Sequence, residues 1–159
     1  MLGGVEDGCM LRARERNRED LSTVTGWIPD ADALNLFTGP RLQWPLTAEQ
    51  MIDMELLDGF SAWIAVDEEL TAVGHFDLTL DHRTARLGRV IIDPEKRGRG
   101  LAHALIHLAI ARARELDADE IQLNVIAGNG PASRTYERAG FTRHPTPLRP
   151  GVERMFLAL

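Results

Sequence analysis

One junction, residues 90–105, restricts the fold of this sequence more than any other segment. It begins with an apolar run of Val90, Ile91 and Ile92, whose composition is typical of a buried strand. From Leu101 onward, apolar residues recur at the three- and four-residue spacing of a long α-helix. The connecting segment "DPEKRGRG" is only as long as a turn. The sequence therefore predicts a strand that passes directly into the longest helix of the chain.

The turn within this junction has the chemistry of an anion-binding site. It contains three basic residues, Lys96, Arg97 and Arg99, and two glycines, Gly98 and Gly100. A helix N-terminus leaves about four backbone N–H groups without partners and has roughly half a positive charge. Glycine lets a ligand approach that backbone closely, and arginine strengthens the binding of phosphate. We therefore expect a phosphate-bearing ligand here, with an ordinary strand–helix turn and surface arginines as the alternative.

The spacing within this turn differs from two common phosphate-binding motifs. The Lys-Ser/Thr pair of a P-loop does not follow the glycines, and His103 stands where a dinucleotide-binding motif has its third glycine. The ligand is therefore expected to be of another class.

The rest of the chain predicts further strands and helices around this junction. The hydrophobic patterns predict strands over 9–14, 60–66, 70–80, 84–92, 121–126 and 154–159, helices over 17–27, 47–58, 98–115 and 130–140, and a structured loop over 36–46. This order predicts an α/β (α+β) domain with a mixed sheet. The length of 159 residues suits a single domain over residues 1–159, with 1–8 as a flexible leader.

Composition restricts the partners of this domain. The chain has 24 acidic and 18 basic residues, a net charge of -6 that argues against nucleic acid as a partner. No apolar run reaches the roughly 20 residues that span a bilayer, which argues against a membrane protein. Cys9 is the only cysteine, which fits a reducing compartment, and a cytoplasmic location is expected. The sequence is compatible with a monomer or a homodimer.

Two motifs together resemble a known enzyme family. The first is Arg-x-x-Gly-x-Ala at Arg97, Gly100 and Ala102, and the second is "NGPASRTYERAGF" over residues 129–141. Their spacing leaves room for one helix and one strand between them. In this respect the chain resembles the GCN5-related N-acetyltransferases, called the GNAT family. The resemblance implies a mixed, mostly antiparallel sheet that is splayed between its fourth and fifth strands and flanked by helices.

The resemblance also implies a role for acetyl-CoA as co-substrate. The backbone of Val90, Ile91 and Ile92 is expected to pair with the pantetheine arm. The pyrophosphate is expected on the amides of Arg97, Gly98, Arg99, Gly100, Leu101 and Ala102. Asn129 would bond the pantetheine or its neighbouring loop, and Tyr136 would donate a proton to the departing thiolate. A strand N–H, that of Ile91 or Ile92, would meet the oxyanion.

The general base is not evident from the sequence. Many members that acetylate protein N-termini or histones have a glutamate on one of the splayed strands, where this chain has Asn124 and, at a less certain position, Arg86. Asn124 cannot accept a proton but could orient a water molecule. His75, Asp77 and Asp93 are alternative bases, each with a surface or structural role as the competing interpretation.

The remaining candidate residues admit two interpretations. Trp27, Phe37 and Trp44 form either an aromatic wall for the acceptor or part of the core. His103 and His107 are interpreted as ordinary residues of a helix face, so no metal site is predicted.

The predicted function is transfer of an acetyl group from acetyl-CoA to a primary amine of a small molecule in a ternary complex. The alternatives are a non-catalytic acyl-CoA-binding sensor or interaction module and a protein N-acetyltransferase.

Overall fold

The structure, a computed structural model, describes residues 10–38 and 42–159. The predictions for residues 1–8 and Cys9, and the centre of the predicted loop at 39–41, lie outside these ranges. The strands are β1 (Arg12–Glu15), β2 (Phe60–Val66), β3 (Ala72–Asp81), β4 (Thr84–Ile92), β5 (Glu120–Ile126), β6 (Thr142–Arg143) and β7 (Val152–Ala158). The α-helices are α1 (Arg18–Gly26), α2 (Ala31–Thr38), α3 (Ala48–Asp53), α4 (Leu101–Glu115) and α5 (Gly130–Arg138), with short 3₁₀ turns at Met54–Leu56 and Pro94–Lys96. No helix among the described residues is both long enough and apolar enough to cross a membrane.

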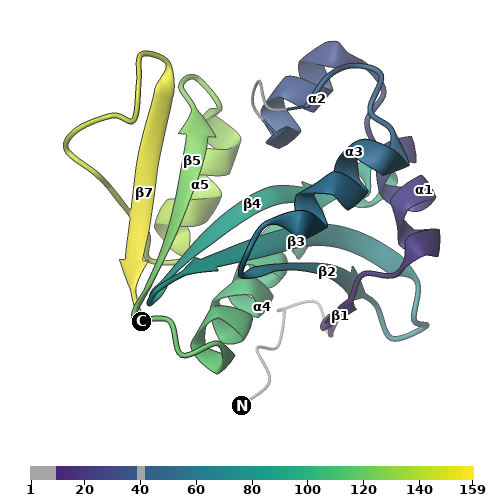
Figure 1. Ribbon diagram of the computed structural model, residues 1–159, viewed down its shortest axis with the longest axis horizontal. Coiled ribbons are helices and arrows are strands. Elements are labelled where there is room, and N and C mark those ends of the chain that lie inside the picture. Colours follow the sequence, from purple (N-terminus) through teal and green to yellow (C-terminus); the bar gives the residue numbers. More distant parts are fainter. Residues whose placement is uncertain (1–9, 39–41) are drawn as a thin grey trace.

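The seven strands form one sheet in the order β1-β2-β3-β4-β5-β7-β6. All neighbouring pairs are antiparallel except β4 and β5, which are parallel. This pair is joined only from Thr84 opposite Glu120 to Leu87 opposite Leu123. Beyond Leu87 the two strands separate, as Figure 1 shows between the teal β4 and the green β5. The predicted fold, a mixed and mostly antiparallel sheet splayed between its fourth and fifth strands, is confirmed.

A bulge in β4 lies at the place where the strands separate. The register of β3 against β4 shifts between His75 and Asp77, and Arg89 on β4 has a φ of 45°. The Arg89 guanidinium forms a two-pronged ion pair with the Asp77 carboxylate, in which the Nη2–Oδ1 distance is 2.6 Å. The His75 Nδ1–H donates to the Arg89 carbonyl oxygen at 2.7 Å. Two buried polar residues of β3, His75 and Asp77, therefore hold the carbonyl group and the side chain of Arg89 in the bulge.

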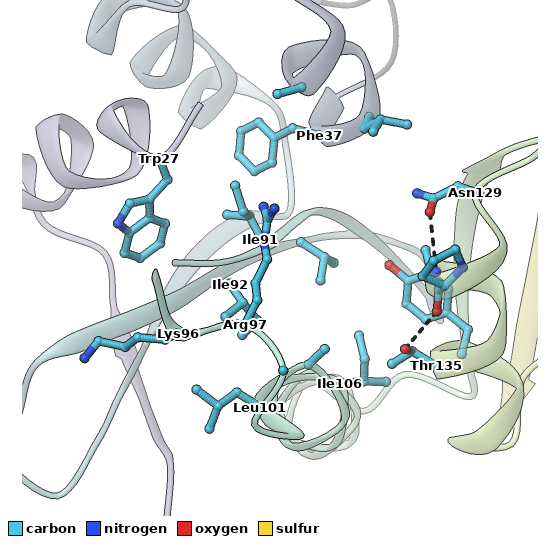
Figure 2. A pocket seen from close by; sticks show the side chains of 18 of the residues that line it. Trp27, Phe37, Ile91, Ile92, Lys96, Arg97, Leu101, Ile106, Asn129 and Thr135 are labelled. Carbon is cyan, nitrogen blue, oxygen red and sulfur yellow. Dashed lines mark hydrogen bonds between the residues drawn. The ribbon is translucent and has the colours of Figure 1, made fainter. Parts of the chain in front are cut away.

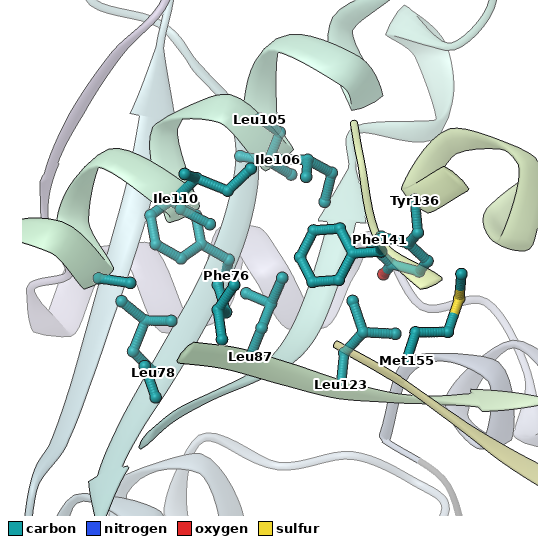
Figure 3. Close-up of a cluster of buried hydrophobic side chains, with 14 of the residues drawn as sticks. Phe76, Leu78, Leu87, Leu105, Ile106, Ile110, Leu123, Tyr136, Phe141 and Met155 are labelled. Carbon is teal, nitrogen blue, oxygen red and sulfur yellow. The ribbon is translucent and has the colours of Figure 1, made fainter. Parts of the chain in front are cut away.

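Each face of the sheet carries its own hydrophobic core. On one face, α4 and α5 cover a cluster that includes Phe76, Leu105 and Phe141, drawn in Figure 3. On the other face, α1, α2 and α3 pack a second cluster that includes Val24, Met51 and Ile64. Leu105 and Ile64 are fully buried at the centres of the two clusters. The splayed part of β4 lies between these two layers.

The region of residues 30–46 differs from the prediction. The segment predicted as a loop over 36–46 begins inside α2, which runs to Thr38. Asp30 caps the start of this helix by accepting the Ala33 N–H at 2.8 Å. Leu34 and Phe37, three residues apart, bury one side of the helix. Prolines flank this short helix at positions 29 and 40, and because proline usually marks a turn or loop, the sequence pattern predicted a loop here.

Candidate functional site

A cavity of about 470 Å³ opens where β4 and β5 separate. Its walls come from β4, from the turn before α4, from α5 and from α2, as Figure 2 shows. Of the twelve residues expected to bind the cofactor or to act in catalysis, ten line it: Val90, Ile91, Ile92, Arg97, Gly98, Gly100, Leu101, Ala102, Asn129 and Tyr136. Arg99 and Asn124 are not among the described residues that line this cavity. The fold therefore brings the two sequence motifs to one place.

The N-terminus of α4 has no side-chain cap. In the described part of the chain, each of the other four α-helices has one: Asn17 for α1, Asp30 for α2, Thr47 for α3 and Asn129 for α5. At the start of α4, the N-cap residue Gly100 has a left-handed φ of 73° and no side chain. Its first turn has no acidic residue. The amides of this turn are thus left to a ligand or to water.

The turn before α4 leaves room beside these amides. Gly98 has a φ of 81°, and a Cβ atom placed on it would meet nothing within 4 Å. Lys96 and Arg97 line the same cavity, and no described lining residue is Asp or Glu. Open space, free amides and two cations fit a phosphate-bearing ligand.

The edge of β4 contributes backbone groups to this cavity. Ile91 and Ile92 pair with His75 and Gly74 on the β3 side. On the β5 side, the pairing ends at Leu87. Alternate residues of a strand direct their main-chain groups to opposite sides, so only part of the N–H and C=O groups of Val90, Ile91 and Ile92 face the gap, where no neighbouring strand pairs with them. An extended ligand with amide groups could pair with this edge as a further strand does.

Tyr136 forms part of the cavity wall from α5. Its ring packs edge-on against Phe141, with 5.8 Å between the ring centroids. Burial raises the pKa of the Tyr136 hydroxyl well above 10. The hydroxyl therefore keeps its proton at neutral pH, and it makes no hydrogen bond within the described residues. A buried, protonated and unpartnered hydroxyl is suited to donate to a ligand atom.

Asn129 has a structural role at the start of the same helix. Its side-chain oxygen accepts the Ala132 N–H at 3.4 Å and caps α5. The amide group of Asn129 also points into the cavity, as Figure 2 shows. One residue can therefore fix α5 and contact a ligand.

A second cavity, of about 400 Å³, shares six lining residues with the first, Val90 and Tyr136 among them. Its walls include Asn124 on β5, Arg86 and Arg89 on β4, and the loop before β7. Arg149, which belongs to neither sequence motif, lies in this loop and also lines the cavity. No spacing pattern could have revealed it, because only the folding of the loop brings it to β5.

The structure places the candidate bases away from both cavities. His75 and Asp77 are fully buried below the β4 bulge. Burial lowers the pKa of His75 to about 4. The Asp93 carboxylate accepts the Glu95 N–H at 3.0 Å and caps a 3₁₀ turn. The structural interpretation therefore holds for all three residues, and no described residue that lines either cavity is Asp or Glu.

Two of the three aromatic candidates are in the site. Trp27 and Phe37 line the first cavity while packing in the core. Trp44 is 44% exposed and is not among the described residues that line either cavity. His103 and His107 contact each other on α4, with 3.0 Å between their Nε2 atoms.

Comparison with known proteins gives a consistent result. Residues 31–141 match the Acetyltransferase (GNAT) family. The peptidyl-lysine N-acetyltransferase YjaB of Escherichia coli is 30% identical over 133 residues, which are 80% of this chain and 79% of that protein. A mycothiol acetyltransferase of Actinosynnema mirum is 29% identical over 144 residues, 86% of this chain and 46% of that protein. The chain spans less than half of the length of the mycothiol acetyltransferases that it matches.

A solved structure shares the fold. It is that of spermidine N-acetyltransferase from Vibrio cholerae in complex with CoA and spermine, with a TM-score of 0.79 and 21% identity over 93% of this chain and 95% of that chain. Since the family match covers most of the sequence, and this architecture agrees with it, the chain belongs to the GNAT family of acetyltransferases.

Proposed function

We propose that this chain works as a single acetyltransferase domain that transfers the acetyl group of acetyl-CoA to a primary amine of a small molecule. The observation that supports the proposal is the pair of cavities that share Val90 and Tyr136. One cavity would hold the acetyl donor and the other the amine. The shared wall would then lie beside the reacting atoms, as direct transfer in a ternary complex requires.

The first cavity fits CoA in three separate parts. The uncapped amides of α4, with Arg97, would hold the pyrophosphate. The free edge of β4 from Val90 to Ile92 would pair with the pantetheine arm, and Asn129 would contact its far end. Arg99 is not among the described residues that line the cavity, so the contact of its backbone amide with the pyrophosphate stays a prediction.

When bound, acetyl-CoA supplies an activated acetyl group, and the residues of this chain would orient the partners and handle protons. An amine with a pKa near 10.4 is neutral in only about one molecule in two thousand at pH 7, which corresponds to roughly 4–5 kcal/mol. Holding the two reactants together can supply about 7–11 kcal/mol. Positioning by the cavity walls is therefore the larger contribution, and Asn124 would orient a water molecule that accepts the amine proton.

Tyr136 is proposed as the donor to the departing sulfur. Its raised pKa keeps the hydroxyl protonated throughout the working pH range. An N–H of the free β4 edge, that of Ile91 or Ile92, would stabilise the developing oxyanion. Apart from Cys9, the sequence has no cysteine to carry an acyl group, which favours direct transfer.

The test is a panel of primary amines incubated with acetyl-CoA and monitored by release of free thiol. We expect release that depends on both the amine and the enzyme. A Gly100→Asp variant serves as the control, because its carboxylate would repel the pyrophosphate. An absence of release across the panel, despite measured CoA binding, would contradict the proposal.

One observation favours a second candidate function. No Asp or Glu is among the described residues that line the cavities, so a strong general base is missing there. A non-catalytic acyl-CoA sensor or interaction module would have this composition. Tight acetyl-CoA binding without turnover would identify it. A protein acceptor, in line with the peptidyl-lysine acetyltransferase relative, would instead appear as acetyl-labelled polypeptides in a lysate.

A further inference from the structure

The second cavity has an unusual charge for this chain. The whole sequence carries 24 acidic residues against 18 basic ones, a net charge of -6. Among the described residues that line this cavity there are three arginines, Arg86, Arg89 and Arg149, and no Asp, Glu or Lys. The local charge is therefore opposite in sign to that of the molecule.

The three arginines differ in how their charge is balanced. Arg89 is neutralised by its buried ion pair with Asp77. Arg86 and Arg149 form no ion pair and no side-chain hydrogen bond within residues 10–38 and 42–159. The cavity thus has two positive charges that no described carboxylate balances.

These two arginines lie at different ends of the same wall. Arg86 is opposite Gln122 in the last paired stretch of β4 and β5. Arg149 forms a bridge with Val152, which is opposite Ile126 at the end of β5. Between them is Asn124, which also lines the cavity. A ligand that lies along β5 would therefore have a guanidinium near each end.

We propose that this cavity binds an amine acceptor that also carries a carboxylate, and that the positive charges of Arg86 and Arg149 attract that carboxylate. This inference rests on the proposed acetyl transfer and names the class of its acceptor. Guanidinium groups bind carboxylates and phosphates through paired, charge-assisted hydrogen bonds. A diamine would instead place a second positive charge beside the arginines.

Matched acceptors provide the test. 4-Aminobutyrate, butylamine and 1,4-diaminobutane each have four carbons, and the fourth carbon is a carboxylate, a methyl group or a methylene that bears an ammonium group. The corresponding sets with two to six carbons cover other distances. With saturating acetyl-CoA and thiol release as the signal, we expect kcat/KM to be highest for the carboxylates, about tenfold or more above the apolar amines, and lowest for the diamines.

Variants connect this preference to the two arginines. The Arg86→Gln and Arg149→Gln substitutions should each raise KM for the carboxylate acceptors by about tenfold or more, with kcat little changed. The matched control is Arg83→Gln, which removes a guanidinium that is 65% exposed and paired with Asp119 outside both cavities. The Arg149→Glu substitution should move the preference toward the diamines. A wild-type preference for diamines, or carboxylate kinetics that neither substitution changes, would overturn the proposal while leaving acetyl transfer intact.

A binding measurement separates this proposal from the proposed function. Calorimetric titration of the same three sets into the protein with CoA needs no turnover. Carboxylate binding that is weakened in Arg86→Gln and Arg149→Gln but not in Arg83→Gln would support the anion site even if no amine is acetylated. A lack of carboxylate binding by the wild-type protein would refute it.

Discussion

Replacing Asp77 by Asn tests how the bulge in β4 is held. The substitution keeps the shape of the side chain and removes its charge. In the structure the Asp77 side chain is 0% exposed and the Arg89 side chain is 8% exposed. The variant would therefore leave the Arg89 guanidinium buried without a counter-charge.

The expected loss of stability follows from this burial. Removing one partner of a buried ion pair costs about 3–5 kcal/mol, because the remaining charge loses both water and its partner. With a urea m-value of about 2 kcal/mol/M, the unfolding midpoint should fall by roughly 1.5–2.5 M. The measurement is urea denaturation at pH 7, followed by circular dichroism and tryptophan fluorescence.

The control is Asp119→Asn, which breaks an exposed pair with Arg83. These side chains are 63% and 65% exposed, so water replaces the lost contact and the midpoint should hardly move. The double substitution Asp77→Leu with Arg89→Met removes both buried charges and should recover most of the stability. If Asp77→Asn unfolds at the same urea concentration as Asp119→Asn, the reasoning about the buried pair is wrong.

Three further predictions concern the site and its pH dependence. Gly100→Asp should abolish CoA binding in calorimetry, because it puts a carboxylate and backbone strain at a left-handed residue beside the phosphate position; unchanged affinity would contradict the anion site. Tyr136→Phe should lower kcat by about 100-fold or more with little change in the KM for acetyl-CoA, and a wild-type rate in the thiol assay would remove Tyr136 from the mechanism. His75 has a pKa of about 4 in the folded protein and of 6.5 in the unfolded chain. As the pH drops, the unfolded chain is therefore protonated at this residue before the folded protein is. The free energy of unfolding should fall by about 3 kcal/mol between pH 6.5 and pH 4. The urea midpoint should therefore drop less between pH 7 and pH 4.5 in His75→Gln than in the wild type. An equal drop in both proteins would show that His75 is not responsible.

The histidine prediction depends on the hydrogen bonds of a single tautomer. The Arg89 carbonyl can only accept, so it requires a proton on His75 Nδ1, whereas the Arg16 guanidinium can only donate to Nε2, at 3.1 Å. Neutral His75 satisfies both contacts. A second proton, on Nε2, would face the Arg16 N–H groups, and this adds to the effect of burial.

Much of the frame could be predicted from the sequence. The pattern of apolar residues predicted β2 and β4 with the bounds observed, because both strands are long. The change from strand to helix near residue 93 predicted the position of α4. By contrast, α2 and the two-residue β6 were missed. Both are short, and their stability comes from packing and pairing with distant segments rather than from local pattern.

The candidate site was only partly accessible to the same reasoning. Gly98 and Gly100 could be found because a left-handed backbone conformation favours glycine, and glycine can be recognised in the sequence. The roles of His75 and Asp77 could not be derived, since alternation places them on one face without showing that Arg89 is opposite them. Arg149 gave no signal at all, because its position depends on the course of the loop from β6 to β7.

The missing cap of α4 has a consequence for local dynamics. Without a side-chain acceptor, the N–H groups of Leu101, Ala102 and His103 depend on water in the free protein, so their exchange with deuterium should be fast. A phosphate bound there would slow that exchange, while the side-chain-capped ends of α1, α2, α3 and α5 would change little. The rate of deuterium exchange in this turn would then measure the fraction of the protein that has a phosphate-bearing ligand bound.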